Sequence, residues 1–339
     1  MSVISKLRRR VSPEEPSPSP RVTIAIATLD RRDSLERTLL SLRELSYPSF
    51  EVVVVNGPST DGTAKMLAEF SEVIRLGTCD VASVGASRNA ATAMSAGELI
   101  AFLDDDAIPP PNWLEMLVPA FADPKVAAAG GPVFDVPLDR VDWRLCTCTR
   151  LGVPVVDSPG PIERYAGVGA DPIAYFAGAN MIIRRSALQD VGGFNPLLTS
   201  SYDDVDICAR LNDAGFALVY VDGALVRHDR APSLTRDEDH HIRDPYRIIT
   251  SRAAFMLQSE HAAHLDVVTQ VLHDWLNDWR NEADSRLTSG RLAEPARDHF
   301  VERAIAGVRD GLAAATEARK SALIPPAPEH LFLEHSKRQ

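Results

Sequence analysis

Apolar runs and amphipathic stretches alternate along the first third of the chain. The runs VTIAIAT, EVVVVN and ELIAFL predict buried strands, and a shorter strand is expected around Val73 to Leu76. The intervening segments DSLERTLLSLRE, AKMLAEF and the stretch around Ala86 to Ala96 predict helices. Strands that are buried on both faces and alternate with helices are typical of a doubly wound, mostly parallel sheet. The ligand crevice of such a sheet lies beyond the carboxyl ends of its strands.

Polar segments follow three of the predicted strands. They are Thr28-Leu29-Asp30-Arg31, the turn Asn56 to Asp61, and the triplet Asp104-Asp105-Asp106. Because the carboxyl ends of parallel strands meet at one edge of a sheet, we expect these three segments to converge.

The last hundred residues have a different pattern. The strand signal ends at about Thr235, and apolar residues then recur at helical spacing, first at Leu265, Val268, Leu272, Trp275 and Trp279 and later at Phe300, Ile305, Val308 and Leu312. The sequence therefore predicts an α/β domain over residues 21–235 and a helical extension over 236–320. Tails are expected at residues 1–20, which are rich in Pro and Ser, and at 321–339.

The first of these apolar stripes is too large to be left in water. The rest of the chain, a second copy or a membrane surface would cover it. Its polar face carries Asp266, Asp274, Asp278 and Glu282, which anionic lipids would repel. We therefore expect packing within the chain or a homodimer, with the homodimer preferred.

Composition and charge exclude several classes of function. Hydrophobic residues make up 45% and charged residues 24%, which is typical of a globular protein. The 36 Lys and Arg against 47 Asp and Glu give a net charge of -11, which repels nucleic acid. Four cysteines favour a reducing compartment, and no apolar run predicts a transmembrane segment or a secretory signal. We expect a cytoplasmic protein, and the basic residues Arg8 to Arg10 leave a peripheral position at the inner face of the membrane open.

The acidic triplet is the first candidate for chemistry. Three adjacent carboxylates at the end of a buried strand would be costly without a cation. Asp104 and Asp106 point the same way in an extended segment and would bring oxygen ligands to Mg²⁺ or Mn²⁺. The alternative is an acidic turn exposed to water.

A second acidic cluster, Tyr202-Asp203-Asp204-Val205-Asp206, begins a predicted helix. One aspartate suffices to cap the helix, which leaves Asp204 available as a general base. The alternative is that Asp204 is itself the cap. His228 lies in the segment RHDR after the apolar run ALVYVDGALV, where its imidazole would join the two aspartates on a metal ion.

Other nucleotide and hydrolase motifs are absent from the sequence. It has no P-loop, no G-x-S-x-G elbow and no G-x-G-x-x-G after the first strand. A nucleotide bound at this sheet would therefore have its phosphates held by a metal ion instead of a glycine cradle.

Eight segments in order resemble the family-two glycosyltransferases with the GT-A fold. They are TIAIATLDR, VVVVNGPSTDGT, GASRNAA, ELIAFLDDDAIPPPNWL, FAGANMIIRRSAL, GGFN, YDDVDICARL and ALVRH, and together they cover about residues 21–235. The resemblance implies an inverting transferase that binds a nucleotide-sugar through Mg²⁺ or Mn²⁺.

The resemblance also implies roles for individual residues. It makes Asp106 the metal ligand, with His228 beside it, and Asp204 the base that activates the acceptor. The donor-binding set is Thr28, Asp30, Asn56, Arg88, Asp104 and Asp105, with Asp104 near the ribose and Arg88 approaching the nucleotide. The acceptor-binding set is Gly178, Ala179, Asn180 and Asp203, although the glycine-alanine pair also fits a tight turn before the strand NMIIRR.

Two positions depart from the family pattern. Asn56 stands where the family usually has an aspartate that binds the nucleobase, and Leu29 stands where an aromatic residue often stacks on it. UDP is the first expectation for the nucleotide. The alternatives are a sugar nucleotidyltransferase and a non-catalytic sugar- or partner-binding member. The acceptor is open between polysaccharide, lipid-linked sugar, peptide and small natural product, since the region from Asp135 to Gly169 carries no interpretable motif.

Overall fold

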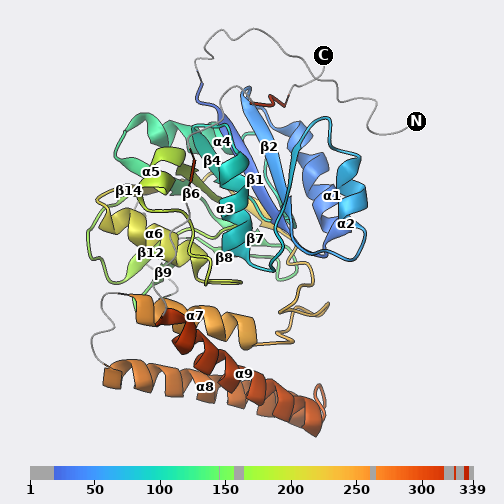
Figure 1. Cartoon of the computed structure of the whole chain (residues 1–339), viewed down its shortest axis with the longest axis vertical. Helices are drawn as coiled ribbons and strands as arrows, with labels where there is room; N and C mark the ends of the chain where they lie inside the picture. The colour runs from blue at the N-terminus through green and yellow to red at the C-terminus, as the bar shows by residue number, and fades with distance from the viewer. Residues whose placement is uncertain are drawn as a thin grey trace.

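The computed structural model describes residues 19–144, 146–155, 164–259, 265–316, 324–325 and 332–335. A mixed sheet with helices on both faces forms the upper part of the molecule, and a layer of three long helices lies below it (Figure 1). Most residues of the two expected tails lie outside the described residues.

The central sheet has eight strands in the order β11-β14-β6-β13-β4-β1-β2-β3. The strands are β1 (Val22–Thr28), β2 (Phe50–Asn56), β3 (Arg75–Thr78), β4 (Leu99–Phe102), β6 (Val126–Gly130), β11 (Arg164–Tyr165), β13 (Met181–Arg184) and β14 (Ala217–Tyr220). β13 is antiparallel to both its neighbours, and β11 is antiparallel to β14, whereas the other pairings are parallel. The mostly parallel, doubly wound sheet is thereby confirmed.

Alternate residues of the central strands enter two different cores. Ile24 and Val54 belong to a cluster with helices α1, α2 and α4, and Ala25 and Val53 belong to a cluster with α3, α5 and α6. The helices are α1 (Arg32–Ser41), α2 (Thr63–Ala68), α3 (Val84–Met94), α4 (Trp113–Leu117), α5 (Arg185–Asp190) and α6 (Asp203–Asp213). Burial on both faces explains why these strands read as continuous apolar runs.

The strand register brings the polar segments together. Thr28 is paired with Asn56, and Ala25 is paired with Phe102, so the first residues after β1, β2 and β4 reach the same edge of the sheet. This is the convergence expected from the sequence.

Two small sheets flank this edge, and the sequence analysis did not predict them. One consists of β5 (Ala107–Ile108), β15 (Val226–His228), β7 (Val133–Asp135) and β8 (Arg140–Trp143), and the other of β10 (Pro154–Val155), β9 (Cys146–Cys148) and β12 (Ile173–Tyr175). All four cysteines are free thiols, as expected.

The extension contains α7 (Tyr246–Gln258), α8 (Leu265–Thr288) and α9 (Glu294–Ala315). α7 lies between the two parts of the molecule, because Phe255 enters the second sheet core while Met256 packs with Val268 and Leu272 of α8. Gly307 and Gly311 let α9 approach α7 closely, since an added Cβ at either position would collide with carbonyl oxygens of α7.

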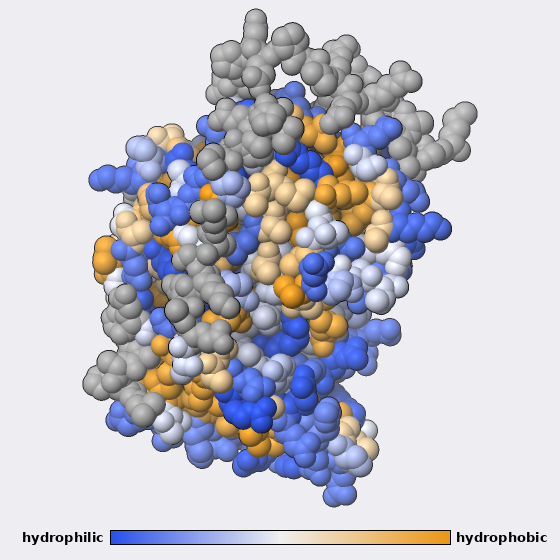
Figure 2. Space-filling model, viewed as in Figure 1, coloured by the Kyte–Doolittle hydropathy of each residue, from blue (hydrophilic) through white to orange (hydrophobic). Residues whose placement is uncertain are grey.

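The apolar stripe of α8 is covered by the chain itself. Trp279 lies against Phe300 of α9, with ring centroids 5.8 Å apart, and the guanidinium of Arg252 lies 4.1 Å from the ring centroid of Trp275. The outer edge of the helical layer is mainly hydrophilic (Figure 2). The stripe alone therefore does not require a second copy, and the homodimer stays a prediction.

The stripe expected on α9 is partly wrong. Ile305 is 50% exposed, and the buried residues of this helix are Phe300, Ala304, Gly307 and Gly311. Val308 and Leu312 pack against the cluster of α7 and α8 as expected, and Gly307 and Gly311 lie where α9 comes closest to α7. No described helix is long and apolar enough to span a bilayer.

We predict that Leu272→Ala destabilises the chain by about 2–5 kcal/mol, because Leu272 is only 6% exposed and its loss leaves a cavity between α7 and α8. Chemical denaturation measures the change. The matched control is Val267→Ala on the same helix. Val267 is 40% exposed, so its substitution should change the stability by less than about 0.5 kcal/mol. Equal effects of the two substitutions would contradict the packing of α8 on α7.

Candidate active site

A cavity of about 500 Å³ opens at the carboxyl ends of the central strands. Segments from both halves of the sheet and from the start of α6 line it. Among the candidate site residues of the sequence analysis, those that line it are Thr28, Arg88, Asp104, Asp105, Gly178, Ala179, Asp203, Asp204 and His228. Leu29 lines it as well, whereas Asp106 does not.

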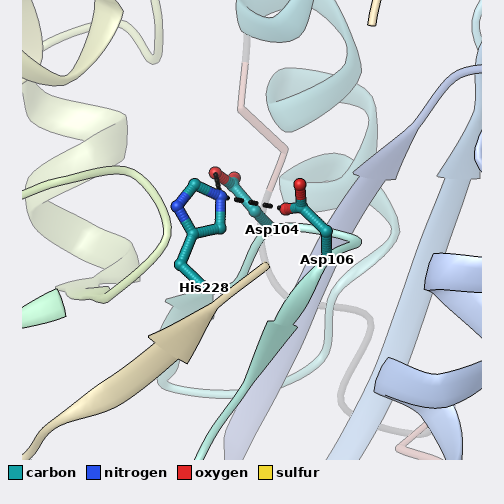
Figure 3. A group of neighbouring side chains, drawn as sticks. All are labelled: Asp104, Asp106 and His228. Atoms are coloured by element: carbon teal, nitrogen blue, oxygen red, sulfur yellow. Dashed lines mark ion pairs between the residues drawn. The ribbon is translucent and has the colours of Figure 1, made fainter. Parts of the chain in front are cut away.

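Two aspartates of the triplet and His228 form one compact group (Figure 3). β5 follows the triplet directly and pairs with β15, so that Ala107 lies opposite His228. The Nε2 atom of His228 is 3.0 Å from Oδ1 of Asp106 and 3.9 Å from Oδ2 of Asp104. One ligand atom from each residue lies within 4.8 Å of the others.

The donor set of this group fits a divalent cation. Asp106 is 2% exposed, and among the described residues its Oδ1 has no hydrogen-bond partner of good geometry despite the nearby imidazole. A buried carboxylate oxygen without such a partner is costly unless a cation satisfies it. Two carboxylates and an imidazole are ligands that Mn²⁺ accepts. These three residues can therefore hold a metal ion.

Arg31 neutralises part of the triplet. Its Nη1 donates hydrogen bonds to Oδ1 of Asp105 at 2.7 Å and to Oδ2 of Asp106 at 2.9 Å. Burial raises the pKa of Asp105 to about 6, although Arg31 opposes the shift. Burial also acts against ionisation of Asp106, but His228 and Arg31 outweigh it and hold the pKa of Asp106 below its usual range. The triplet thus contains two carboxylates with very different proton affinities.

Arg88 joins the two acidic clusters. It is buried, with Nη1 bonded to Asp203 and Nη2 3.2 Å from Asp104, and it packs over the rings of Phe102 and Phe194. Gly178 lies against its guanidinium, where an added Cβ would collide. The resemblance placed Arg88 near the nucleotide, and it does line the cavity, but two carboxylates already occupy its guanidinium.

Asp204 lies in the first turn of α6, within the cavity. The helix begins after Tyr202, which has a left-handed backbone with φ of 63° and makes no side-chain cap. Asp204 accepts hydrogen bonds from the N–H of Val205 at 2.8 Å and from the N–H of Gly178 at 3.3 Å. Burial and the neighbouring Asp203 raise the pKa of Asp204 to about 7, with Arg88 acting in the opposite direction. Such a carboxylate is suited to take up a proton near neutral pH.

Helix α7 supports the segment that precedes Asp204. Ser251 accepts hydrogen bonds from the N–H groups of Thr199 at 3.1 Å and Ser200 at 3.4 Å. The ring of Tyr202 stacks on Phe255 at 5.5 Å, and its hydroxyl donates to the carbonyl of Gly152 at 2.8 Å. The helical layer therefore contacts the residues that set the start of α6.

Asp30 and Asn56, which were expected to bind the donor, do not line the cavity but support the turn beside it. Asp30 accepts a hydrogen bond from the N–H of Thr60 at 2.6 Å, and Asn56 accepts one from the Ser59 hydroxyl at 2.7 Å. These contacts hold the turn after β2. Next to them, Thr28 lines the cavity, and its buried hydroxyl has no hydrogen-bond partner of good geometry among the described residues.

Asn180, which was expected to bind the acceptor, does not line the cavity. Asn180 is fully buried and is not part of the cavity wall, because its side chain donates to the carbonyls of Pro132 and Ala224 and accepts from the indole N–H of Trp113. Asn180 therefore holds β-structure together, whereas Gly178 and Ala179 line the cavity as expected.

The sequence analysis predicted Arg88 at the site but assigned no role to four further arginines of the cavity wall. They are Arg31, Arg230, Arg236 and Arg247. Arg31 and Arg230 bond to carboxylates, but no ion pair to the guanidinium of Arg236 occurs within the described residues. Burial, and then the charges of Arg230 and Arg31, lower the pKa of Arg236. Its only sequence signal was its position in the polar segment after His228.

Comparison with known proteins gives a consistent result. Residues 23–192, half of the chain, match the family model described as Glycosyl transferase family 2. A pre-mycofactocin glycosyltransferase of Mycobacterium tuberculosis is 30% identical over 246 residues, which cover 66% of this chain and 46% of that protein. The chain thus spans about half the length of this relative.

Solved structures share the fold. A mannosyltransferase of Pyrobaculum calidifontis, in complex with GDP-Man and Mn²⁺, has a TM-score of 0.52 and 19% identity, covering 91% of each chain. TarS of S. aureus, in complex with UDP-GlcNAc, has a TM-score of 0.50 and 18% identity, covering 87% of this chain and 83% of that one. Together with the topology, these likenesses confirm the GT-A fold.

The raised pKa of Asp204 predicts a pH dependence of stability. The native chain holds this proton more tightly than the unfolded chain, so the stabilising contribution is complete below about pH 4 and is lost as the pH rises through about 7. Asp204→Asn removes the ionisation, so its melting temperature relative to wild type should be higher at pH 8 than at pH 5. Asp222→Asn, at an exposed carboxylate outside the cavity, is the control for the effect of an Asp-to-Asn substitution itself. A parallel pH dependence of wild type and Asp204→Asn would contradict the assignment.

Proposed function

The chain belongs to glycosyl transferase family 2, and from this premise we propose that it is an inverting glycosyltransferase. It moves a sugar from a nucleotide-sugar to an acceptor hydroxyl, with a divalent metal ion assisting departure of the diphosphate. One observation carries the proposal. Asp104 and His228, which form a metal-binding group with the buried Asp106, line the same cavity as Asp204, a carboxylate with a pKa raised to about 7.

The metal ion would be held by Asp104, Asp106 and His228. When bound, it supplies positive charge that offsets the charge growing on the departing diphosphate. Mn²⁺ or Mg²⁺ suits these ligands.

The residues of the chain perform the remaining steps. Asp204 removes the proton from the acceptor hydroxyl, whose oxygen forms a bond to the anomeric carbon as the bond from that carbon to the diphosphate breaks. The attack comes from the face opposite the leaving group, which inverts the configuration. Hydrogen bonds from Gly178 and Val205 hold the carboxylate of Asp204 in position. The proton passes to Asp204 and the electron pair leaves with the diphosphate, so the step is balanced.

Basic side chains of the wall favour an anionic donor. Arg236 lines the cavity, and no carboxylate of the described residues forms an ion pair with it, so its planar guanidinium is available for a phosphate group. Gly178 and Ala179 leave room for the sugar between donor and acceptor.

The donor is proposed to be UDP-linked. Asn56 lies behind the cavity wall and accepts a hydrogen bond from Ser59, so its amide does not by itself decide the nucleobase. The proteins of similar fold were solved with GDP-Man and with UDP-GlcNAc. The acceptor is proposed only as a hydroxyl compound. We place the reaction in the cytoplasm, where thiols such as the four of this chain stay reduced.

The products of a donor panel test the proposal. The full chain is incubated with Mn²⁺ and UDP- or GDP-linked sugars, and the released nucleotide is identified. Nucleoside diphosphate supports transfer or slow donor hydrolysis. In a parallel incubation with sugar 1-phosphates and UTP or GTP, release of pyrophosphate would favour nucleotidyl chemistry. Absence of any product in both incubations would favour a binding protein.

We predict that Asp204→Asn reduces sugar transfer about 100-fold or more while donor affinity stays nearly unchanged, because the amide cannot accept the acceptor proton. The wild-type rate should rise as the pH increases through about 7. Steady-state rates and calorimetric titration with UDP separate the two effects. A variant that retains full activity would remove Asp204 from the catalytic step.

We predict that Asp106→Ala abolishes metal-dependent donor binding, because a methyl group offers no ligand to a hard cation. Calorimetry with UDP is carried out with and without Mn²⁺. Asp229→Ala, a partly exposed carboxylate just after His228, is the control and should bind as wild type does. An unchanged affinity of Asp106→Ala for UDP in the presence of Mn²⁺ would favour the alternative that the triplet is an acidic turn and binds no metal ion.

A further inference from the structure

Arg31 occupies a place between the two segments that carry the metal-binding group. It follows the turn after β1 and immediately precedes α1. Its side chain is only 16% exposed, although it lies beside the cavity. Burial acts against its charge, but Asp105 and Asp106 outweigh this effect and raise the pKa of Arg31, so it remains a cation.

Each nitrogen of the Arg31 guanidinium is engaged. Nη1 donates to Asp105 and Asp106, Nη2 donates to the carbonyl of Ala231 at 2.9 Å, and Nε donates to the carbonyl of Pro232 at 3.0 Å. Two acceptors belong to the acidic triplet, and two belong to the segment that follows His228. A planar fork with fixed donor directions holds such acceptors in one relative geometry.

The contact with Asp106 also selects which of its oxygens is available. Oδ2 accepts from Arg31 and, at 2.7 Å, from the N–H of Ala231. Oδ1 is therefore left facing His228 and is the atom of the metal-binding group. The guanidinium thus fixes the rotation of the carboxylate as well as its distance from the imidazole.

We propose that Arg31 is a positioning residue for the divalent cation, holding Asp106 and His228 at the separation that one ion requires. The proposal rests on the proposed function, since it concerns the same metal ion.

Arg31 could instead affect the affinity for the cation through its charge alone, and this effect would have the opposite sign. If Arg31 acted on the cation only through its charge, it would repel the ion, and its removal would strengthen binding. If it acts by positioning, its removal weakens binding, as the loss of residues that orient metal ligands does, by about 10- to 100-fold. The direction of the change therefore decides between them.

The experiment measures Mn²⁺ affinity by the electron paramagnetic resonance signal of the free ion, without nucleotide and with excess UDP or GDP. Arg31→Gln should bind Mn²⁺ about 10-fold or more weakly. Arg31→Lys should also be weakened, because an ammonium group keeps the charge but cannot bridge four acceptors. Arg37→Gln is the matched control: Arg37 pairs with partly exposed Asp229 next to His228, and its loss should leave the affinity unchanged.

The outcomes separate this proposal from the proposed function. Suppose that wild type binds Mn²⁺ and that Asp106→Ala does not. If Arg31→Gln then binds Mn²⁺ as tightly as wild type or more tightly, the positioning role is overturned, but the proposed transferase function is not. If Arg31→Gln fails to fold, Arg31→Lys decides, because full affinity in that folded variant overturns the role equally. Failure of wild type to bind Mn²⁺ under all conditions overturns the metal site and the metal-assisted reaction together.

Discussion

The gathering of five aspartates around one cavity is the constraint on which the rest of the structure depends. Carboxylates removed from water repel each other, so each needs a cation, a hydrogen-bond donor or a proton. Arg31 serves the triplet, and Arg88 serves Asp104 and Asp203. The proton affinities of the carboxylates differ from one position to another. The pKa of Asp106 is lowered and that of Asp204 is raised to about 7, so the two acidic clusters contain one carboxylate that stays ionised and another that exchanges protons near neutral pH. Opposite shifts of this kind allow neighbouring carboxylates to take different chemical roles.

The architecture of the sheet was largely accessible from the sequence. Runs such as VTIAIAT and EVVVVN have no polar face, which identifies strands covered on both sides, and the convergence of the following turns is a consequence of parallel pairing. The two small sheets were not accessible, because strands as short as Ala107–Ile108 and Pro154–Val155 exist through pairing with other segments and have no pattern of their own. Similarly, Gly307 and Gly311 carry no apolar signal, although they determine how closely α9 approaches α7.

The candidate site was predictable where residue type limits the possible roles. Asp104, Asp106 and His228 come from two segments more than a hundred positions apart, yet carboxylates and an imidazole that follow buried strands have few roles besides binding a cation. Asn180 shows the limit, since an amide near a cavity can equally satisfy buried carbonyls, and only the positions of Pro132 and Ala224 decide. Arginines are the hardest to assign. The long side chain of Arg31 reaches partners 74 to 201 positions away, and nothing in its neighbourhood along the chain identifies them.

The seam between α7 and the segment before α6 has a consequence for protein engineering. Ser251 binds the backbone of Thr199 and Ser200, and Phe255 supports the ring of Tyr202, directly ahead of Asp204. A recombination junction between the α/β part and the helices would cut through these contacts. A helical layer grafted from another chain would therefore have to supply an equivalent hydroxyl and aromatic face. Otherwise the chimera would retain the acidic triplet at the edge of the sheet while losing the geometry of Asp204 at the start of α6.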